Sequence, residues 1–171
     1  MVIYRPSTEE TLEFDVERRN VVLPSVEEEM LEGNIGYIQI TDFQKKTAEQ
    51  FAEKVEKLKA QNVKGLIIDL RGNGGGLLNE AVDIVNLFVP KNKLVVYTKG
   101  KTPEQNRNYY TKHEAEDTEI PLVILVNEGS ASASEIVSGS IQDFDRGVIV
   151  GQRTFGKGLV QNILPMSYNT Q

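Results

Sequence analysis

Residues 66–78 read LIIDLRGNGGGLL, and this stretch decides the fold. Its first five residues are almost continuously apolar, which is typical of a strand in a sheet covered on both faces. Four glycines then fall within residues 72–76, and apolar residues at helical spacing run from Leu78 to Phe88. A buried strand, a glycine loop and an amphipathic helix in succession form one unit of a layered sheet. The stretch therefore predicts an α/β domain.

The same alternation of strand and helix continues on both sides of this unit. The predicted strands are residues 11–16, 35–40, 94–97, 122–126, 148–150 and 159–164, and the other predicted helices are residues 47–58 and 131–144. Thr47 is expected to cap the first of these helices, with Gln50 completing a capping box. The acidic run at residues 27–29 is interpreted as a solvated linker, and the polar residues 100–119 as an exposed excursion.

Composition limits the partners and the chemistry. The 171 residues carry a net charge of −6, which disfavours nucleic acid or anionic lipid as the main partner. There is no cysteine, and the carboxylates show no spacing typical of metal ligands, so neither a metal nor a cofactor is expected. No apolar run is long enough for a membrane span. Residues 1–6 lack the basic region and long apolar core of a signal peptide, so none is expected in this fragment.

Two further segments carry residues suited to nucleophilic catalysis. Residues 129–136 read GSASASEI, and residues 154–161 read TFGKGLVQ. Ser130, Ser132 and Ser134 are all candidate nucleophiles at the start of a helix, although serine is also a favoured helix cap. Lys157 lies between two glycines, and a neutral lysine amine can accept the proton of a serine hydroxyl. Because the chain has one histidine and no cysteine, the commoner nucleophile–base pairs are nearly excluded.

Neighbouring residues indicate how the lysine would be supported and which other groups are unsuitable. Burial against Phe155 would favour the neutral amine. If residues 157–161 form a strand, the Gln161 amide lies on the same face as Lys157 and can orient its amine.

Asp143 is eleven residues beyond Ser132, three helical turns away, and is interpreted as a structural carboxylate paired with Arg146. His113 lies in a polar segment and is expected at the surface.

The glycine loop at residues 71–76 offers backbone N–H groups at the start of a helix. Such a loop can bind a phosphate or the oxyanion of an acyl-transfer intermediate, and it can also be only a tight turn. It does not match a P-loop, because no Gly-Lys-Ser/Thr closes it, and the spacing of a dinucleotide-binding loop is absent. With a serine and a lysine elsewhere in the chain, an oxyanion hole is the more economical interpretation.

Three blocks together resemble the carboxyl-terminal processing proteases, also called tail-specific proteases, of the S41 serine peptidase family. They are LRGNGGG at residues 70–76, SASASE at residues 130–135, and TFGKG with VQ at residues 154–161. By this resemblance the nucleophile lies 25 residues before the lysine, which selects Ser132 for Lys157, and Gln161 matches the helper glutamine. The resemblance also implies oxyanion donors from the Gly75–Gly76 pair and from the backbone of Ala133. The family usually has proline where Gly74 stands.

The resemblance implies a fold, a domain division and a setting. The fold would be a ClpP/crotonase-like layered α/β core, preceded by a remnant of the connection from a PDZ domain. Residues 1–31 would be the strands and linker that leave the PDZ domain, and residues 32–171 a C-terminally truncated peptidase core. The implied partners are protein or peptide substrates with apolar C-terminal tails, and the implied location is the bacterial cell envelope or periplasm. An unpaired sheet edge would favour a homo-oligomer.

The resemblance favours one function among three. The chain would be a serine endopeptidase that cleaves proteins near their C-terminal tails through an acyl-enzyme on Ser132. One alternative is a non-catalytic peptide-binding fragment that recognises peptides by strand addition. The other is a crotonase-like acyl-CoA enzyme, since that fold also combines glycine loops with repeated strands and helices.

Overall fold

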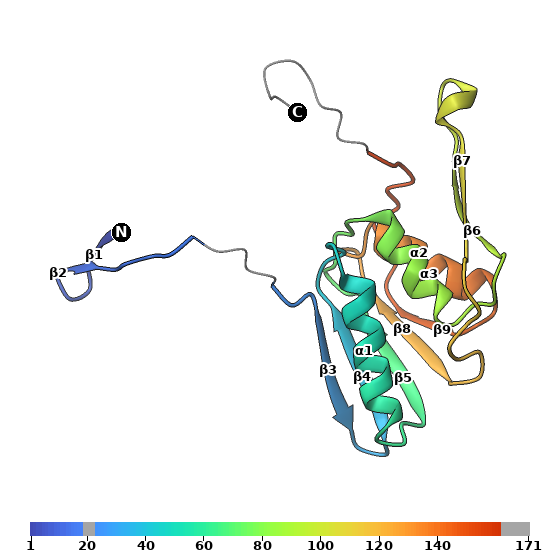
Figure 1. Ribbon diagram of the computed structural model, residues 1–171, viewed down its shortest axis with the longest axis horizontal. Helices are drawn as coiled ribbons and strands as arrows, with labels where there is room; N and C mark the ends of the chain where they lie inside the picture. The colour runs from blue at the N-terminus through green and yellow to red at the C-terminus, as the bar shows by residue number, and fades with distance from the viewer. Residues whose placement is uncertain (19–22, 162–171) are drawn as a thin grey trace.

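The computed structural model describes residues 1–18 and 23–161. Its main body is a five-stranded sheet with three helices, and Figure 1 draws the hairpin of β1 and β2 apart from that body. In chain order the elements are β1 (Val2–Arg5), β2 (Glu10–Glu13), β3 (Val26–Leu31), β4 (Ile35–Ile40), α1 (Thr47–Lys59), β5 (Gly65–Asp69), α2 (Leu78–Asn86), β6 (Leu94–Thr98), the 3-10 helix η1 (Pro103–Gln105), β7 (Arg107–Tyr110), β8 (Leu122–Val126), α3 (Ala133–Asp143) and β9 (Val148–Gly151).

The main sheet is mixed, with the strand order β3-β4-β5-β8-β9. β3 is antiparallel to β4, and the remaining neighbours are parallel. Each parallel neighbour is reached through a connection that contains a helix, as parallel strands require. The predicted α/β class is therefore confirmed, and its sheet is mixed.

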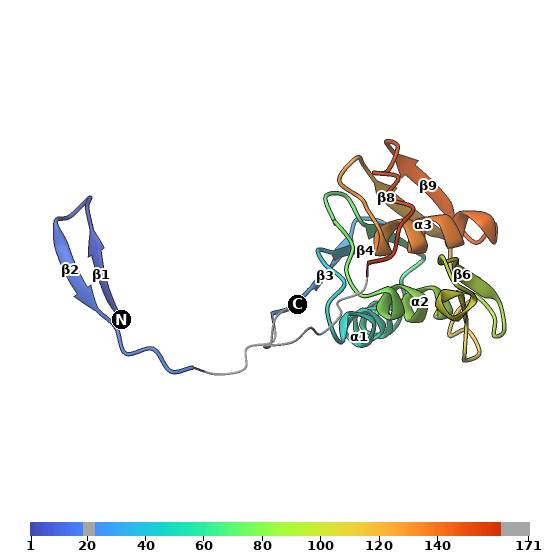
Figure 2. The same ribbon diagram turned by 90° about the horizontal axis from the view of Figure 1, so that it is seen from above.

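The core lies between the sheet and the helices, which cover one face of it (Figure 2). Ile38 of β4, Ile68 of β5 and Ile124 of β8 are in register across three strands and are completely buried. On the helix side, the ring of Phe51 in α1 meets the ring of Phe88 just after α2, with centroids 6.1 Å apart at 81°. This edge-to-face contact connects the first two helices over the centre of the sheet.

The other face of the sheet is only partly covered by the described residues. Alternate residues of the central strands point away from the helices, and those of β5 and β8 are half-buried. The apolar residues on this side, named here the open face, are Leu31, Ile35, Ile67, Val123, Leu125, Val148 and Val150. The prediction that residues 66–70 belong to a sheet covered on both faces is therefore wrong for the described chain, because all three helices lie on one side.

The start of α1 differs from the predicted capping box. Lys46, in a left-handed conformation at φ 76°, occupies the N-cap position, and Thr47 is already helical and buried. The Thr47 hydroxyl lies 2.6 Å from Ser25 Oγ and accepts a hydrogen bond from the Gln44 N–H at 3.0 Å. The Gln50 side chain accepts from the Ser25 N–H at 3.0 Å. Both residues thus fasten the chain that enters β3 instead of capping their own helix.

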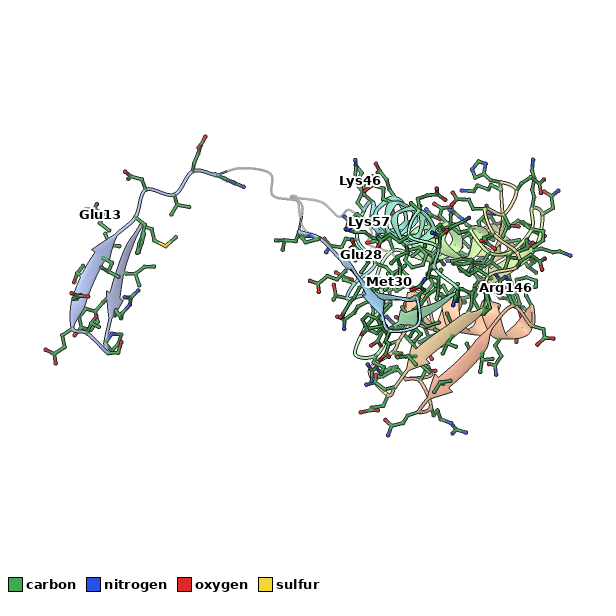
Figure 3. The ribbon with its side chains drawn as sticks, turned by 90° about the horizontal axis from the view of Figure 1, so that it is seen from below. Glu13, Glu28, Met30, Lys46, Lys57 and Arg146 are labelled. Atoms are coloured by element: carbon green, nitrogen blue, oxygen red, sulfur yellow. The ribbon has the colours of Figure 1, made fainter. Side chains whose placement is uncertain are left out.

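Three other segments also differ from prediction. The acidic run at residues 27–29 is the middle of β3 and not a linker, because Glu28 faces α1 and bonds to Lys54 and Lys57, as Figure 3 shows for Lys57. Within residues 100–119, β7 pairs with β6 in a hairpin that extends beyond the helices (Figure 1). Of the predicted strand at 159–164, residues 159–161 are in no strand, and the remainder lies outside the described residues.

Candidate functional site

Three loops meet at the carboxyl ends of the parallel strands. The glycine loop follows β5, the serine turn of residues 127–132 follows β8, and the lysine segment of residues 152–157 follows β9. Parallel strands place their carboxyl ends at one edge of the sheet, where α/β proteins commonly bind their ligands. The fold therefore brings all three predicted blocks to the same edge.

The structure distinguishes the three serines of the turn. Ser130 is completely buried, and its hydroxyl donates to the Leu70 carbonyl at 2.7 Å. Ser134 is also completely buried, and its hydroxyl donates to the Asn73 carbonyl at 2.9 Å. Ser132 is half-buried and has φ 57° and ψ −112°, a conformation that an L-residue rarely adopts. Strained backbone of this kind is common at functional sites, and it sets Ser132 apart from its two neighbours.

The glycine loop packs directly on the serine turn. A side chain at Gly75 would place its Cβ 2.7 Å from Ser132 Cβ and 2.9 Å from the Ala133 nitrogen. A side chain at Gly76 would place its Cβ 2.3 Å from the Phe43 carbonyl oxygen. Both glycines have positive φ, of 102° and 142°. They are therefore required for close approach and for backbone conformation, whereas Gly74 has nothing within 4 Å of such a Cβ.

The backbone donors of this region are not equivalent. The Gly75 N–H donates to Asn73 Oδ1 at 2.9 Å, so it is already occupied. The Ser132 N–H donates to Glu135 Oε2, also at 2.9 Å. Within the described residues, the N–H groups of Gly76 and Ala133 donate a hydrogen bond to no protein acceptor. Of the three predicted oxyanion donors, Gly76 and Ala133 are the two with an available N–H.

Asn73 and Asn127 fasten the glycine loop to the serine turn. Asn73 is 1% exposed, and its carbonyl accepts from the Ala131 N–H at 3.0 Å. Asn127 Oδ1 accepts from the Gly72 N–H at 2.8 Å and from the Gly129 N–H at 3.0 Å. The two loops therefore form one hydrogen-bonded unit although they are about sixty residues apart in sequence.

Lys157 approaches the same unit from the end of β9. Its ammonium nitrogen Nζ lies 3.1 Å from Gln161 Oε1, so the predicted neighbours are in contact although residues 157–161 form no strand. In the described residues no hydrogen bond joins Lys157 Nζ to Ser132 Oγ. The expected burial against Phe155 is not found, because that ring is 67% exposed. Gly156 and Gly158 supply positive φ and not close approach, since both have open space around the Cβ position.

Glu135 connects the serine turn to the lysine segment. Its Oε2 accepts from the N–H groups of Ser132 at 2.9 Å and Lys157 at 3.1 Å. Its Oε1 accepts from the Gly156 N–H at 2.6 Å and from the Thr154 hydroxyl at 2.9 Å. Burial raises the pKa of Glu135, but these four hydrogen bonds outweigh it and the pKa is lowered. The carboxylate is therefore charged at neutral pH.

A second buried carboxylate supports the start of the glycine loop. Asp69, at the end of β5 and 1% exposed, accepts from the Arg71 guanidinium at 2.6 Å and from the Tyr37 hydroxyl at 2.6 Å. Burial raises the pKa of Asp69, but the bonds from Arg71 and Tyr37 lower it further than burial raises it. The bidentate pairing fixes Arg71 at the point where the loop leaves the sheet.

Sequence reasoning overlooked the roles of Glu135, Asn73 and Asp69. Glu135 stands three residues after Ser132, and a serine followed by glutamate at that spacing is a recognisable helix-start signal. The Asp-x-Arg spacing of residues 69–71 is a local pattern that permits the observed pair. Nothing in the sequence around Asn73 indicates its contacts with residues sixty positions later.

The other residues considered from sequence lie elsewhere. Asp143 does not pair with Arg146, whose guanidinium instead donates to the carbonyls of Phe88 and Asp117, each at 3.2 Å. The exposed His113 is held through its backbone by Asn86, away from the serine turn.

Among the described residues, no cluster of histidines and carboxylates is suited to hold a metal ion. No helix in the described ranges is long and apolar enough to cross a membrane.

Known proteins share this arrangement of sequence and fold. A carboxyl-terminal-processing protease from Synechocystis sp. is 37% identical over 169 residues, which cover 96% of this chain and 39% of the relative. The carboxy-terminal processing protease CtpA of Bacillus subtilis is 35% identical over 150 residues, covering 88% of this chain and 32% of the relative. The solved structure of a photosystem II D1 C-terminal processing protease is 33% identical with a TM-score of 0.73, and the match covers 95% of this chain and 44% of that one.

These matches show the family of the chain and how much of its relatives it covers. The chain spans well under half the length of each of the proteins named above. The family model for peptidase family S41 matches residues 34–171, which include the glycine loop, the serine turn and the lysine segment. On this match and on the identity to the Synechocystis protein, the chain belongs to peptidase family S41.

Proposed function

We propose that this chain is the peptidase core of a serine endopeptidase that cleaves proteins near their C-terminal tails. The observation that carries the proposal is the isolation of Ser132 among three serines. Its neighbours have buried hydroxyls that are bonded to loop carbonyls, whereas Ser132 lies half-buried on a strained turn beside the two available N–H groups. The same turn shares the Glu135 carboxylate with the backbone of Lys157.

The proposed reaction begins with proton transfer. The neutral amine of Lys157 removes the proton of Ser132 Oγ, which attacks the carbonyl carbon of the scissile peptide bond. Gln161 Oε1, 3.1 Å from the amine nitrogen, orients that amine without adding a charge that would hold it protonated. Rotation about the side-chain bonds of Lys157 moves its amine, so the amine can turn from Gln161 towards Ser132 when substrate is bound.

The glycine loop would stabilise the intermediate and complete the cycle. The oxyanion accepts from the N–H groups of Gly76 and Ala133, while Gly75 keeps the loop against the turn. The carbon–nitrogen bond then breaks, and the lysine ammonium returns its proton to the leaving amine. Water hydrolyses the remaining ester on Ser132 with Lys157 again as the base, which releases the new C-terminus.

The proposal also covers the fold type of the core and the domain before it. We propose that the core has a ClpP/crotonase-like layered fold, and that residues 1–31 form the exit from a PDZ domain that captures apolar C-terminal tails. The core itself would cover residues 32–171, although its sheet begins earlier, at β3. The Synechocystis and Bacillus relatives come from bacteria, and we place the complete protein in the bacterial cell envelope or periplasm.

A serine-reactive fluorophosphonate probe tests the proposed roles in the complete protein. The wild type should be labelled on Ser132, and Ser132→Ala should abolish both labelling and peptide cleavage. Lys157→Arg should also abolish both, because a guanidinium is similar in charge but does not act as a base near neutral pH. The double variant with Ser132→Ala and Lys157→Arg should cleave no more slowly than either single variant, since the effects of residues that act as a unit are not additive.

The control variant is Asp143→Asn, which removes an exposed carboxylate at the far end of α3 and should label at the wild-type rate. A folded wild type that takes no label would favour a peptide-binding role without catalysis. Near-normal labelling and cleavage by Lys157→Arg would show that the lysine supplies only a charge, and the proposed mechanism would be wrong.

A further inference from the structure

We propose that Glu135 is a positioning residue that holds the nucleophile and the base in one geometry. This inference rests on the proposed function, because it concerns how the Ser132 turn and Lys157 come together. The carboxylate contacts both segments at once, with the backbone N–H groups of Ser132 and Lys157 both within 3.1 Å of a single oxygen, Oε2.

The lysine segment depends on this carboxylate for its position. In the described residues, four hydrogen bonds tie residues 154–157 to the serine turn and the first turn of α3, and three of them end on Glu135. The fourth runs from the Phe155 N–H to the Ser130 carbonyl at 3.0 Å. Gly156 and Gly158 have open space around them, and the Phe155 side chain is mostly exposed, so packing contributes little.

The chemistry of the four contacts requires a carboxylate. Each oxygen of Glu135 accepts two hydrogen bonds, and all four partners are donors. A glutamine of the same shape offers one acceptor oxygen, and its NH2 group would face either the Ser132 and Lys157 N–H donors or the Gly156 N–H donor and the Thr154 hydroxyl. Neutralising this position therefore leaves at least one backbone N–H of the bridge without its acceptor, whichever way the amide is turned.

The same contacts exclude a direct chemical role for Glu135. Both oxygens are occupied, and the bonds that they accept lower the pKa of the carboxyl, so it remains charged. A group in that state is a poor general acid or base for a reaction near neutral pH. Its contribution is the separation and orientation of Ser132 and Lys157. A displacement of about 1 Å between reacting groups can lower a rate by about 10²-fold.

Two variants of the complete protein test the inference. Glu135→Gln keeps the shape and leaves at least one backbone N–H of the bridge without its acceptor. Glu135→Asp keeps a negative charge in the first turn of α3 but retracts the carboxylate by one carbon–carbon bond, so that it no longer spans both segments. Each variant should lower the rate of fluorophosphonate labelling of Ser132 by about 10²-fold. Asp143→Asn on the same helix is the matched control and should label normally.

A second measurement separates positioning from loss of the fold. Hydrogen exchange should become faster at the amides of Gly156 and Lys157 in both variants, while the buried amides of β5 and β8 and the thermal unfolding midpoint stay close to wild type. A purely structural role would instead lower the midpoint and accelerate exchange throughout the core. Glu135→Asp retains the helix charge, so it decides the question if Glu135→Gln does not fold.

The outcomes are distinguishable from failure of the proposed function. The positioning role is overturned if a folded Glu135→Asp variant labels within twofold of wild type, or if exchange at residues 156 and 157 does not change. A wild type that is never labelled overturns the serine peptidase proposal. The exchange experiment would still decide in that case whether Glu135 holds the two segments together.

Discussion

Single residues in this chain acquire distinct roles through what their polar atoms contact. Ser130, Ser132 and Ser134 are alike in sequence, yet Ser130 and Ser134 are buried donors to loop carbonyls, whereas Ser132 is half-buried and its hydroxyl donates to no carbonyl among the described residues. Asn73 is bonded through both its backbone and its side chain. Its backbone carbonyl accepts from the Ser134 hydroxyl, and its side-chain amide donates to the Ile40 carbonyl and accepts from the Gly75 N–H. At this scale the functional assignment depends on which hydroxyls are already occupied.

Glu28 provides a test of electrostatics at one residue. Hydrogen bonds from Lys54 and Lys57 lower the pKa of Glu28 from 4.5 to about 2. Because the folded pKa is the lower one, the pair stabilises the fold above pH 4.5 and its contribution is lost as the pH falls from 4.5 towards 2. Glu28→Gln should therefore lower the free energy of unfolding at pH 7 by about 1 kcal/mol or less, since the Lys57 side chain is 61% exposed.

The measurement is urea unfolding of both proteins between pH 7 and pH 2. The difference between wild type and Glu28→Gln should narrow across that interval and vanish at its acid end. Glu27→Gln is the control, because Glu27 lies on the opposite face of β3 and is exposed. A difference that stays constant with pH would mean that the ion pairs do not stabilise the fold.

At the scale of elements, the loops are shaped by glycines that differ in their surroundings. Gly75→Ala and Gly76→Ala should each destabilise the fold by about 1–3 kcal/mol, because the new Cβ would lie within 2.7 Å of backbone oxygen at Ala131 or Phe43. Both should also slow labelling of Ser132 by about 10²-fold, since the loop is pushed off the serine turn. Gly74→Ala is the matched control and should change stability by less than about 0.5 kcal/mol.

Unfolding by guanidinium chloride and the labelling rate check this prediction together. Equal stability of all three alanine variants would mean that the loop can shift without cost. Normal labelling of Gly75→Ala would show that contact between the glycine loop and the Ser132 turn is not needed for reactivity.

Periodicity predicted the elements whose burial follows a simple pattern and missed those whose burial does not. The three helices and the strands at residues 35–40, 66–70 and 122–126 have apolar residues at the expected spacing, and all of them form within a few residues of prediction. β3 was missed because the middle one of its inward positions is Glu28, which the lysines of α1 neutralise. β7 was missed because the RNYY sequence of its four residues contains no aliphatic side chain.

The site was predictable in part for a related physical reason. The blocks that contain Ser132, Lys157 and the glycines are visible as local sequence, and the fold brings them to one edge. The packing of the Ser132 turn on the glycine loop and the bridge from Glu135 to the lysine segment depend on contacts between segments twenty to sixty residues apart. Local pattern carries no information on such contacts, so only the structure could assign them.

For the whole molecule, the uneven coverage of the sheet has a measurable effect. The open face is apolar, and Val148 and Val150 on it are 61% and 47% exposed at the edge strand β9. Exposed apolar surface next to an edge that no described strand pairs with favours association, so the 171-residue chain should self-associate as its concentration rises. Replacing both valines with lysine should shift it to the monomer and leave the fold intact, because neither side chain belongs to the core.

Sedimentation velocity over a range of concentrations checks this prediction. Tyr97→Lys is the control, since it removes an equally exposed apolar residue on the β6–β7 hairpin, away from the open face. Association that persists in the valine double variant, or that disappears in Tyr97→Lys, would place the contact elsewhere.

The order of the segments along the chain has a consequence for synthesis on the ribosome. In the described residues, the hydrogen bonds between the Ser132 turn and the glycine loop involve no residue beyond 134, whereas the partners of Glu135 at residues 154–157 are translated later. A growing chain that has reached residue 150 thus contains every residue of those bonds but not Lys157, the base of the proposed mechanism. Under that proposal, the Ser132 hydroxyl would have no base to activate it until the lysine segment has been made and has bound to Glu135.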